Sequence, residues 1–229
     1  MATATYLSQN DQTVLGVLFD AEGGMSNTPP QPTSIPIRDQ LTQKLQRHER
    51  QLLLALSNDN PDRSSLESTV IALDQLIAQH PAYASAYNNR AQTRRLMYSL
   101  DELAARPEVV RQLFGDLDTA IQLASPSHPH SGGVTADQAT VLSAAHTHRA
   151  SLLYEGSKRR TTHHLLASIE RYADLDADSL QELASLDFAE GGRYGHGVAK
   201  QMAVMTNPYA KLCGEMVKQA MQREMSGSV

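Results

Sequence analysis

The sequence has few aromatic residues and almost no cysteine: it contains no tryptophan, one cysteine and 5% aromatic residues in a chain of 229. The lone Cys213 excludes an internal disulfide framework and fits a reducing compartment. With so few large rings, a core must be built mainly from Leu, Ala, Ile, Val and Met, which favours packed helices over a β-sandwich. The composition therefore predicts an all-α protein with one sizeable core.

Long apolar runs and an excess of positive charge are also missing. No window of 18 apolar residues occurs, so we expect no membrane span. The first residues, MATATYLSQNDQ, lack a basic region followed by an apolar run, so we expect no signal peptide. The net charge of −5, with both signs mixed along the chain, gives no footprint for nucleic acid. We therefore expect a cytoplasmic protein that binds neither membrane nor nucleic acid.

The most informative stretch is residues 82–96, AYASAYNNRAQTRRL, which follows Pro81 directly. Tyr87 and Ala91 are four residues apart and Ala84 precedes Tyr87 by three, so an aromatic and two small side chains share one helix face. A small residue there lets a second helix approach closely. This arrangement, followed by a second helix and a terminal proline at a period of about 34 residues, is typical of tetratricopeptide (TPR) repeats. The stretch resembles the first helix of a TPR repeat.

Helical periodicity extends this pattern over residues 37–206, where we predict about three TPR-type hairpins that form a short right-handed superhelix. The segment around 161–174, with Leu165, Leu166 and Tyr172 on one face, predicts an extra helix inserted into the third repeat. The hairpin helices are expected at 37–57 and 64–80, at 82–100 and 107–124, and at 135–154 and 178–191.

Both ends of the chain are predicted to carry additional helices. Residues 10–19, NDQTVLGVLF, place apolar side chains at helical spacing, and a proline-rich linker follows, so residues 1–36 form an N-terminal helix and linker. Residues 207–229 predict a C-terminal capping helix, because the end of a helical stack would otherwise expose apolar surface.

Three separated blocks are similar to the tetratricopeptide repeat protein 36 family. They are NDQTVL followed by LF at 10–19, ASAYNNRAQ followed by RRL at 84–96, and Gln201 with NPYA and LC at 207–213. The resemblance implies a small three-repeat adaptor without enzymatic activity or cofactor. It also implies two partners, the chaperone Hsp70 and 4-hydroxyphenylpyruvate dioxygenase of tyrosine catabolism, neither of which follows from composition or spacing.

In TPR stacks the first helix of each hairpin lines a concave groove that holds an extended peptide. Asn89 falls where TPR proteins that grip the acidic C-terminus of Hsp70 or Hsp90 place a clamp asparagine. Such a clamp also needs cations from neighbouring repeats, and the third repeat offers Ala144 and His148 there, so the clamp is predicted to be incomplete. Alternatively, Asn89 is structural and bonds to a neighbouring helix. The full set predicted to line the groove is Ser85, Asn88, Asn89, Gln92, Arg95, His148 and Ser151.

Other hypotheses stay open beside the adaptor. A helical enzyme, or a protein that binds metal or small molecules through its nine histidines, is the rival. The pairs at 128/130, 146/148 and 163/164 lack the one-turn spacing of helical metal ligands, and no carboxylates are paired by a motif, so we predict no metal site and no catalytic residues. The glycines of 191–197 follow a helix and predict a tight chain reversal, not a phosphate loop. Residues 10–19 could also fill the groove themselves.

Overall fold

The computed structural model describes residues 40–54, 56, 61–126, 133–159 and 164–226. These residues are helical and contain no strand, which confirms the all-α prediction. The predicted N-terminal helix and linker, residues 1–36, lie outside the described residues. The elements are α2 (Gln40–Leu54), α3 (Arg63–Gln79), α4 (Ala84–Met97), α5 (Leu100–Ala104), α6 (Pro107–Ala124), α7 (Ala136–Lys158), η1 (Glu170–Tyr172), α9 (Ala177–Arg193), α10 (Gly197–Thr206) and α11 (Pro208–Ser226).

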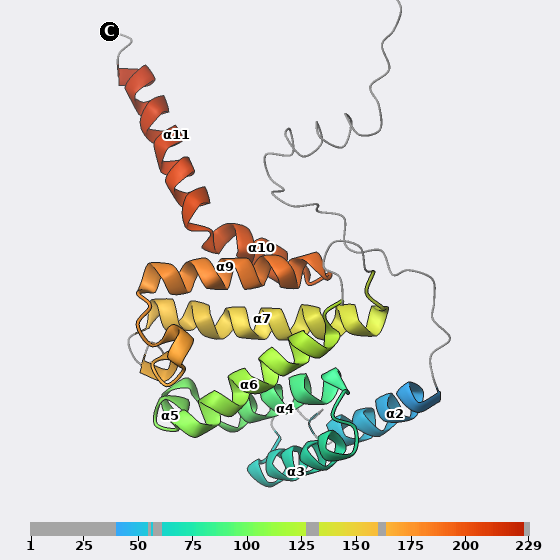
Figure 1. Ribbon diagram of the computed structural model, residues 1–229. Helices are drawn as coiled ribbons and strands as arrows, with labels where there is room; N and C mark the ends of the chain where they lie inside the picture. The colour runs from blue at the N-terminus through green and yellow to red at the C-terminus, as the bar shows by residue number, and fades with distance from the viewer. Residues whose placement is uncertain (1–39, 55, 57–60, 127–132, 160–163, 227–229) are drawn as a thin grey trace, which may run out of the picture.

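The helices form a stack in which each packs mainly on its neighbours in the sequence (Figure 1). The chain of contacts runs from α3 through α4, α6, α7 and α9 to α10. In addition α4 contacts α7, so the first helices of the second and third predicted hairpins lie against each other. The predicted groove residues lie on these two helices.

Local capping explains where several of these helices begin. At α7 the Thr135 side chain accepts from the Gln138 amide while Gln138 bonds back to Thr135, so the predicted start is confirmed. Ser99 and Glu102 form a second capping box that begins the short α5, which the sequence did not lead us to expect. Elsewhere the N-caps are Asp62 and Asp176, two residues before the predicted starts of α3 and α9.

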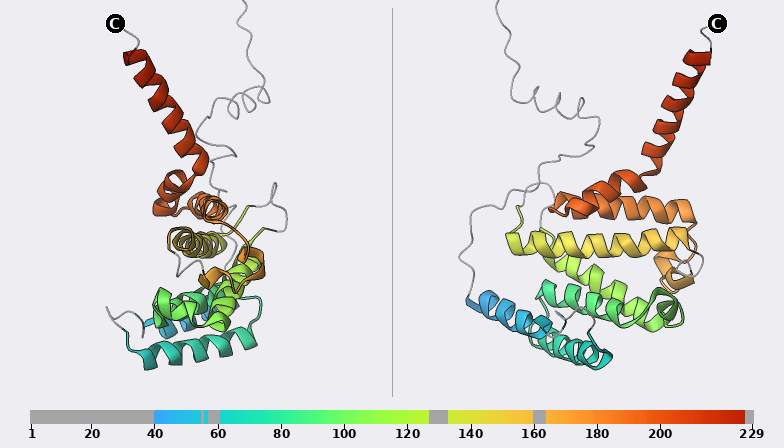
Figure 2. Two further views of the ribbon diagram at one scale, coloured as in Figure 1. Left: turned by 90° about the vertical axis from the view of Figure 1, so that its left-hand side faces the viewer. Right: turned by 180° about the vertical axis from the view of Figure 1, so that it is seen from behind.

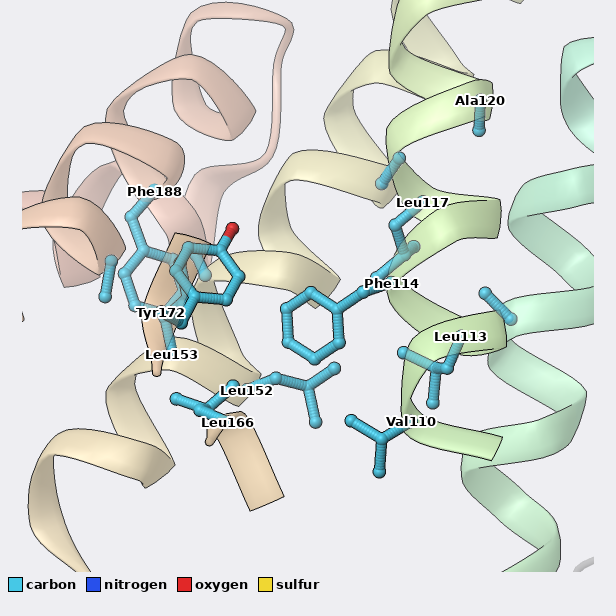
Figure 3. Close-up of a cluster of buried hydrophobic side chains, with 14 of the residues drawn as sticks. Val110, Leu113, Phe114, Leu117, Ala120, Leu152, Leu153, Leu166, Tyr172 and Phe188 are labelled. Atoms are coloured by element: carbon cyan, nitrogen blue, oxygen red, sulfur yellow. The ribbon is translucent and has the colours of Figure 1, made fainter. Parts of the chain in front are cut away.

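The main core lies between α6, α7, α9 and the segment before α9 (Figure 3). One face of α6 supplies Leu113, Leu117 and Ala120, each at most 1% exposed. Phe114 reaches from α6 to Tyr172, with ring centroids 5.6 Å apart in a T-shaped arrangement. Ala91 is fully buried, as expected of a small residue at a close helix crossing.

The inserted helix predicted around 161–174 is not continuous. Its described part forms one helical turn at 164–166, bends, and then forms the 3₁₀ turn η1. The Ser168 hydroxyl donates to the Leu165 carbonyl, and the Ile169 amide bonds to the Leu166 carbonyl three residues back, so the chain tightens instead of extending the α-helix. The side chains of the predicted apolar face are nevertheless buried: Leu165, Leu166 and Tyr172 all lie in the core.

The C-terminal helix also differs from the prediction. The helix that covers α9 is α10, whereas α11 projects away from the stack (Figure 2). Tyr209, Met216, Val217 and Met221 on α11 are 58–64% exposed, so α11 does not cap the stack. The side chain of Cys213 lies outside the described residues. No helix within the described ranges is long and apolar enough to cross a membrane.

The glycines before α10 have two separate roles. Gly195, with a φ of 105°, makes the predicted chain reversal between α9 and α10. Gly191 and Gly192 instead lie inside the last turn of α9. A Cβ on Gly192 would come within 2.8 Å of the Lys200 Cα, so a bare backbone is needed for α10 to pack this closely.

Replacing Gly192 by alanine should therefore destabilise the protein by about 1–3 kcal/mol, because the atom in the way is main chain and cannot rotate aside. Gly115 in α6 is the matched control: its Cβ would meet nothing within 4 Å, so Gly115→Ala should stabilise by about 0.5–1 kcal/mol. Urea unfolding followed by circular dichroism measures both. Equal effects of the two substitutions would contradict the close approach of α9 and α10.

Candidate protein-binding surface

The three arginines of α4 have different surroundings. Arg90 and Arg94 both bond to Asp116 on α6, and Arg90 Nη1 lies 2.6 Å from Asp74 Oδ1 on α3. Arg95 lies near His148 and Glu155 of α7, and its Nη1 donates to the Tyr98 carbonyl at 2.8 Å. In the described part of the chain no carboxylate lies within ion-pair distance of Arg95. It is thus a partly buried cation without an anionic partner in contact.

His148 on α7 faces this cation. Its Nδ1 is buried and has no hydrogen-bond partner among the residues that the structure describes. Burial, together with the charge of Arg95, lowers the pKa of His148 to about 4, so the ring is neutral at pH 7. Burial also lowers the pKa of Arg95, an effect that the charge of Glu155 opposes. Glu155 Oε2 lies 3.2 Å from Arg159 Nε but is buried and has no hydrogen-bond partner among the described residues.

Further toward the N-terminus of α4, the polar residues gather around Glu49 of α2. Its carboxylate is 6% exposed and accepts from Tyr83 Oη at 2.7 Å, from Ser85 Oγ at 2.8 Å and from Asn89 Nδ2 at 2.8 Å. Burial and the Glu49 charge raise the pKa of Tyr83, so its phenol stays protonated and donates. Over the described ranges no cation pairs with Glu49. Its buried carboxylate is therefore satisfied by three neutral hydrogen-bond donors.

The seven predicted groove residues, five on α4 and two on α7, therefore divide into three groups. Ser85 and Asn89 are engaged by Glu49, and Asn89 has the cross-helix bond of the structural interpretation. Arg95 and His148 come together between α4 and α7. The remaining three sit beside these groups: Asn88 is buried with a free Oδ1, Gln92 is exposed, and Ser151 is exposed with its hydroxyl on the Thr147 carbonyl.

The sequence analysis missed Glu49 and Tyr83. A usable signal existed for Glu49, because it falls on the apolar stripe of α2, four residues after Leu45 and three before Leu52. A charged residue on a buried stripe needs hydrogen-bond partners from a neighbouring helix. The partner helix could not be deduced from that spacing alone.

A groove of about 770 Å³ opens beside the Glu49 cluster. One wall is α2, and the other is formed by the first turns of α4 and α7 and the last turn of α6. Ser85 lines it, whereas Arg95 and His148 do not. The helices α4 and α7 thus carry two distinct features, this groove at their first turns and the Arg95–His148 pair further along.

The other buried histidine is part of a structural brace. His146 Nδ1 lies 2.9 Å from Asp187 Oδ1, and Arg149 joins Asp187 on α9 to Asp118 on α6. Burial raises the pKa of Asp187, but the hydrogen bonds from Arg149 and His146 outweigh it and bring the pKa below its usual range. Within the described ranges no three His, Cys, Asp or Glu side chains converge as a metal site would require.

The chain is similar to two kinds of known protein, hmgX and tetratricopeptide repeat protein 36. It is 36% identical to the L-tyrosine degradation gene cluster protein hmgX of Aspergillus fumigatus, over 97% of this chain and 95% of that protein. It is 31% identical to tetratricopeptide repeat protein 36 of Mus musculus over 70% of this chain and 63% of that protein, and 28% identical to the Danio rerio protein over 71% and 64%. No family model matches the chain. No solved structure matches it either.

An all-α stack of helical hairpins with these relatives is a protein similar to tetratricopeptide repeat protein 36, as the sequence blocks predicted. The chain belongs to the same family as hmgX, to which it aligns over nearly its full length.

Proposed function

We propose that the protein is a non-enzymatic cytoplasmic adaptor that binds a protein partner through the concave side of α4 and α7. We further propose that the partner is an enzyme of tyrosine catabolism. Support for the pathway comes from the relative hmgX, whose name places it in an L-tyrosine degradation gene cluster. Support for protein binding comes from the similarity to tetratricopeptide repeat protein 36.

The observation that carries the proposal is the state of Arg95. Arg95 is partly removed from water and touches no carboxylate of the described residues. Such a guanidinium is a receptor for a carboxylate, because the ion pair recovers the solvation that burial has cost. Beside it, His148 adds a neutral ring nitrogen that has no hydrogen-bond partner within the described ranges. An acidic side chain or C-terminus of an extended partner segment would therefore sit between α4 and α7.

Hsp70 is the second candidate partner, since its acidic C-terminus offers the same group to Arg95. A two-cation clamp lacks support from the described residues: Asn89 is engaged by Glu49, and His148 stays neutral. Binding of Hsp70 would rest on Arg95 and on the exposed amide of Gln92. The catabolic enzyme is therefore the first candidate partner and Hsp70 the second.

Arg95→Ala should weaken partner binding about 10-fold or more, as expected for loss of a charge-assisted hydrogen bond worth about 1.5–3 kcal/mol. Calorimetric titration with purified enzymes of tyrosine catabolism, and separately with a peptide of the Hsp70 C-terminus, measures this and separates the two partners. Arg111→Ala, which removes an exposed arginine of α6, is the control and should leave affinity unchanged. Affinity should also stay constant between pH 5 and 8, because His148, with a pKa of about 4, does not titrate there.

If the Arg95→Ala variant bound its partner with unchanged affinity, the side of α4 and α7 that carries Arg95 would not be the binding surface. The rival hypothesis, a metal-binding or enzymatic protein that uses the histidines, is tested by metal analysis of the purified chain. Stoichiometric metal would favour the rival over the adaptor.

A further inference from the structure

The groove beside α2 is an open surface with both apolar and polar walls. Leu54 on α2 is 62% exposed and Leu123 at the end of α6 is 36% exposed, and both line the groove with Val141 of α7. The groove lies near Ser85, which is ten residues and therefore about 15 Å along α4 from Arg95. An occupant of the groove can therefore differ from the partner that Arg95 receives.

The chain itself carries a suitable occupant. Residues 10–19 space Val14, Leu15, Leu18 and Phe19 as the apolar face of a short helix. A helix of ten residues is about 15 Å long, shorter than the 15-residue α2 that forms the groove wall. The segment therefore fits within the length of that wall.

The connection between segment and groove is short enough for docking. Residues 20–39 join the segment to Gln40, the first residue of α2, so the chain arrives directly at the groove wall. A random coil of twenty residues has a root-mean-square span of about 25 Å, and the prolines of this linker favour a longer one, so its length is sufficient to reach along α2. Such a tether holds the segment at an effective concentration on the order of millimolar at the groove. A contact with a dissociation constant below that value would therefore be mostly formed.

The charged residues of the groove do not select the occupant. Arg50, exposed on α2, is the one cationic side chain among the lining residues, and Glu49 and Asp137 are two carboxylates in the same lining. Glu49 is already bonded to Tyr83, Ser85 and Asn89. What favours residues 10–19 as the occupant is therefore their apolar face and their position in the chain next to α2.

We propose that residues 10–19 dock into the groove formed by α2 and the first turns of α4 and α7 of the same chain. The docked segment adds one helix to the N-terminal end of the stack and covers Leu54, Leu123 and Val141. It leaves Arg95 and His148 open, so the proposal does not depend on the partner of the adaptor.

The test uses cysteine pairs in the full-length chain, in a Cys213→Ser background so that no other thiol is present. Gly16→Cys lies beside the apolar face of the segment, and Thr140→Cys is exposed on the α7 side of the groove. With oxidised glutathione as the oxidant, the intramolecular disulfide of this pair should form at least about 10-fold faster than that of the control pair Gly16→Cys with Gly115→Cys. Gly115 lies in the separate hollow between α6 and η1 and has free space for a side chain.

Adding Leu18→Asp should bring the rate of the groove pair down to that of the control pair, because the apolar contact is lost while the tether is kept. Equal rates for the two pairs would overturn the proposal. Disulfide-linked dimers in place of the intramolecular product would overturn it as well, by showing that the segment comes from a second copy. No partner takes part in this assay, so its outcome is independent of the adaptor function.

Discussion

Replacing Asp116 by asparagine is expected to lower the free energy of unfolding by about 3–5 kcal/mol. The Asp116 side chain is 6% exposed, and it bonds to Arg90 and Arg94, whose side chains are 16% and 13% exposed. Without the carboxylate, two adjacent guanidinium groups would be held at low exposure without a buried anion between them. The variant keeps the shape of the side chain, so the loss reports charge and not a cavity. Urea unfolding followed by circular dichroism measures it.

Asp74 provides the control for this experiment. It faces the same two arginines from α3, 2.6 Å from Arg90 and 4.0 Å from Arg94, but its side chain is 48% exposed. Water can replace it, so Asp74→Asn should cost no more than about 1 kcal/mol. Similar losses for the two variants would show that burial does not set the strength of these ion pairs.

Replacing Phe114 by alanine is expected to cost about 3–5 kcal/mol, because the ring is 2% exposed and fills the space between α6 and η1. The same unfolding experiment measures it, with Leu186→Ala, at a position 59% exposed, expected within about 0.5 kcal/mol of wild type. The cycle of Phe114→Ala with Tyr172→Ala should give a coupling energy of at least about 0.5 kcal/mol. Strict additivity would mean that the segment before α9 does not pack on α6.

Much of the fold could be predicted because its signals are local. The cap at Thr135, the small residue Ala91 and the stripe of Leu113 and Leu117 each depend on residues within one or two turns. The insert failed as a continuous helix because the same apolar spacing is satisfied by a turn and a 3₁₀ segment, and the contact with Phe114 selects between them. The apolar spacing of α11 likewise does not say whether a neighbouring helix covers it.

The candidate site was predictable only in its residue types. Arg90, Arg94 and Arg95 look alike in the sequence, and which of them lacks a carboxylate depends on Asp74 and Asp116 of other helices. The structural interpretation of Asn89 predicted a bond to a neighbouring helix, but its partner Glu49 lies forty residues earlier. Pairings of that kind depend on how the hairpins stack, which helical spacing does not specify.

The Glu49 cluster determines how the molecule opens at its N-terminal end. Leu45 and Glu49 are the only buried residues of α2 in the described part of the chain. Leu45 packs with Leu73, Leu76 and Ala86 in a small apolar cluster, and Glu49 adds hydrogen bonds to α4 that water can replace. The helices α6, α7 and α9 instead share the apolar core and can separate only when that core is lost. We therefore expect the amide protons of α2 to exchange with solvent through a local opening of low free energy. Those of α7 should exchange only when the whole protein unfolds.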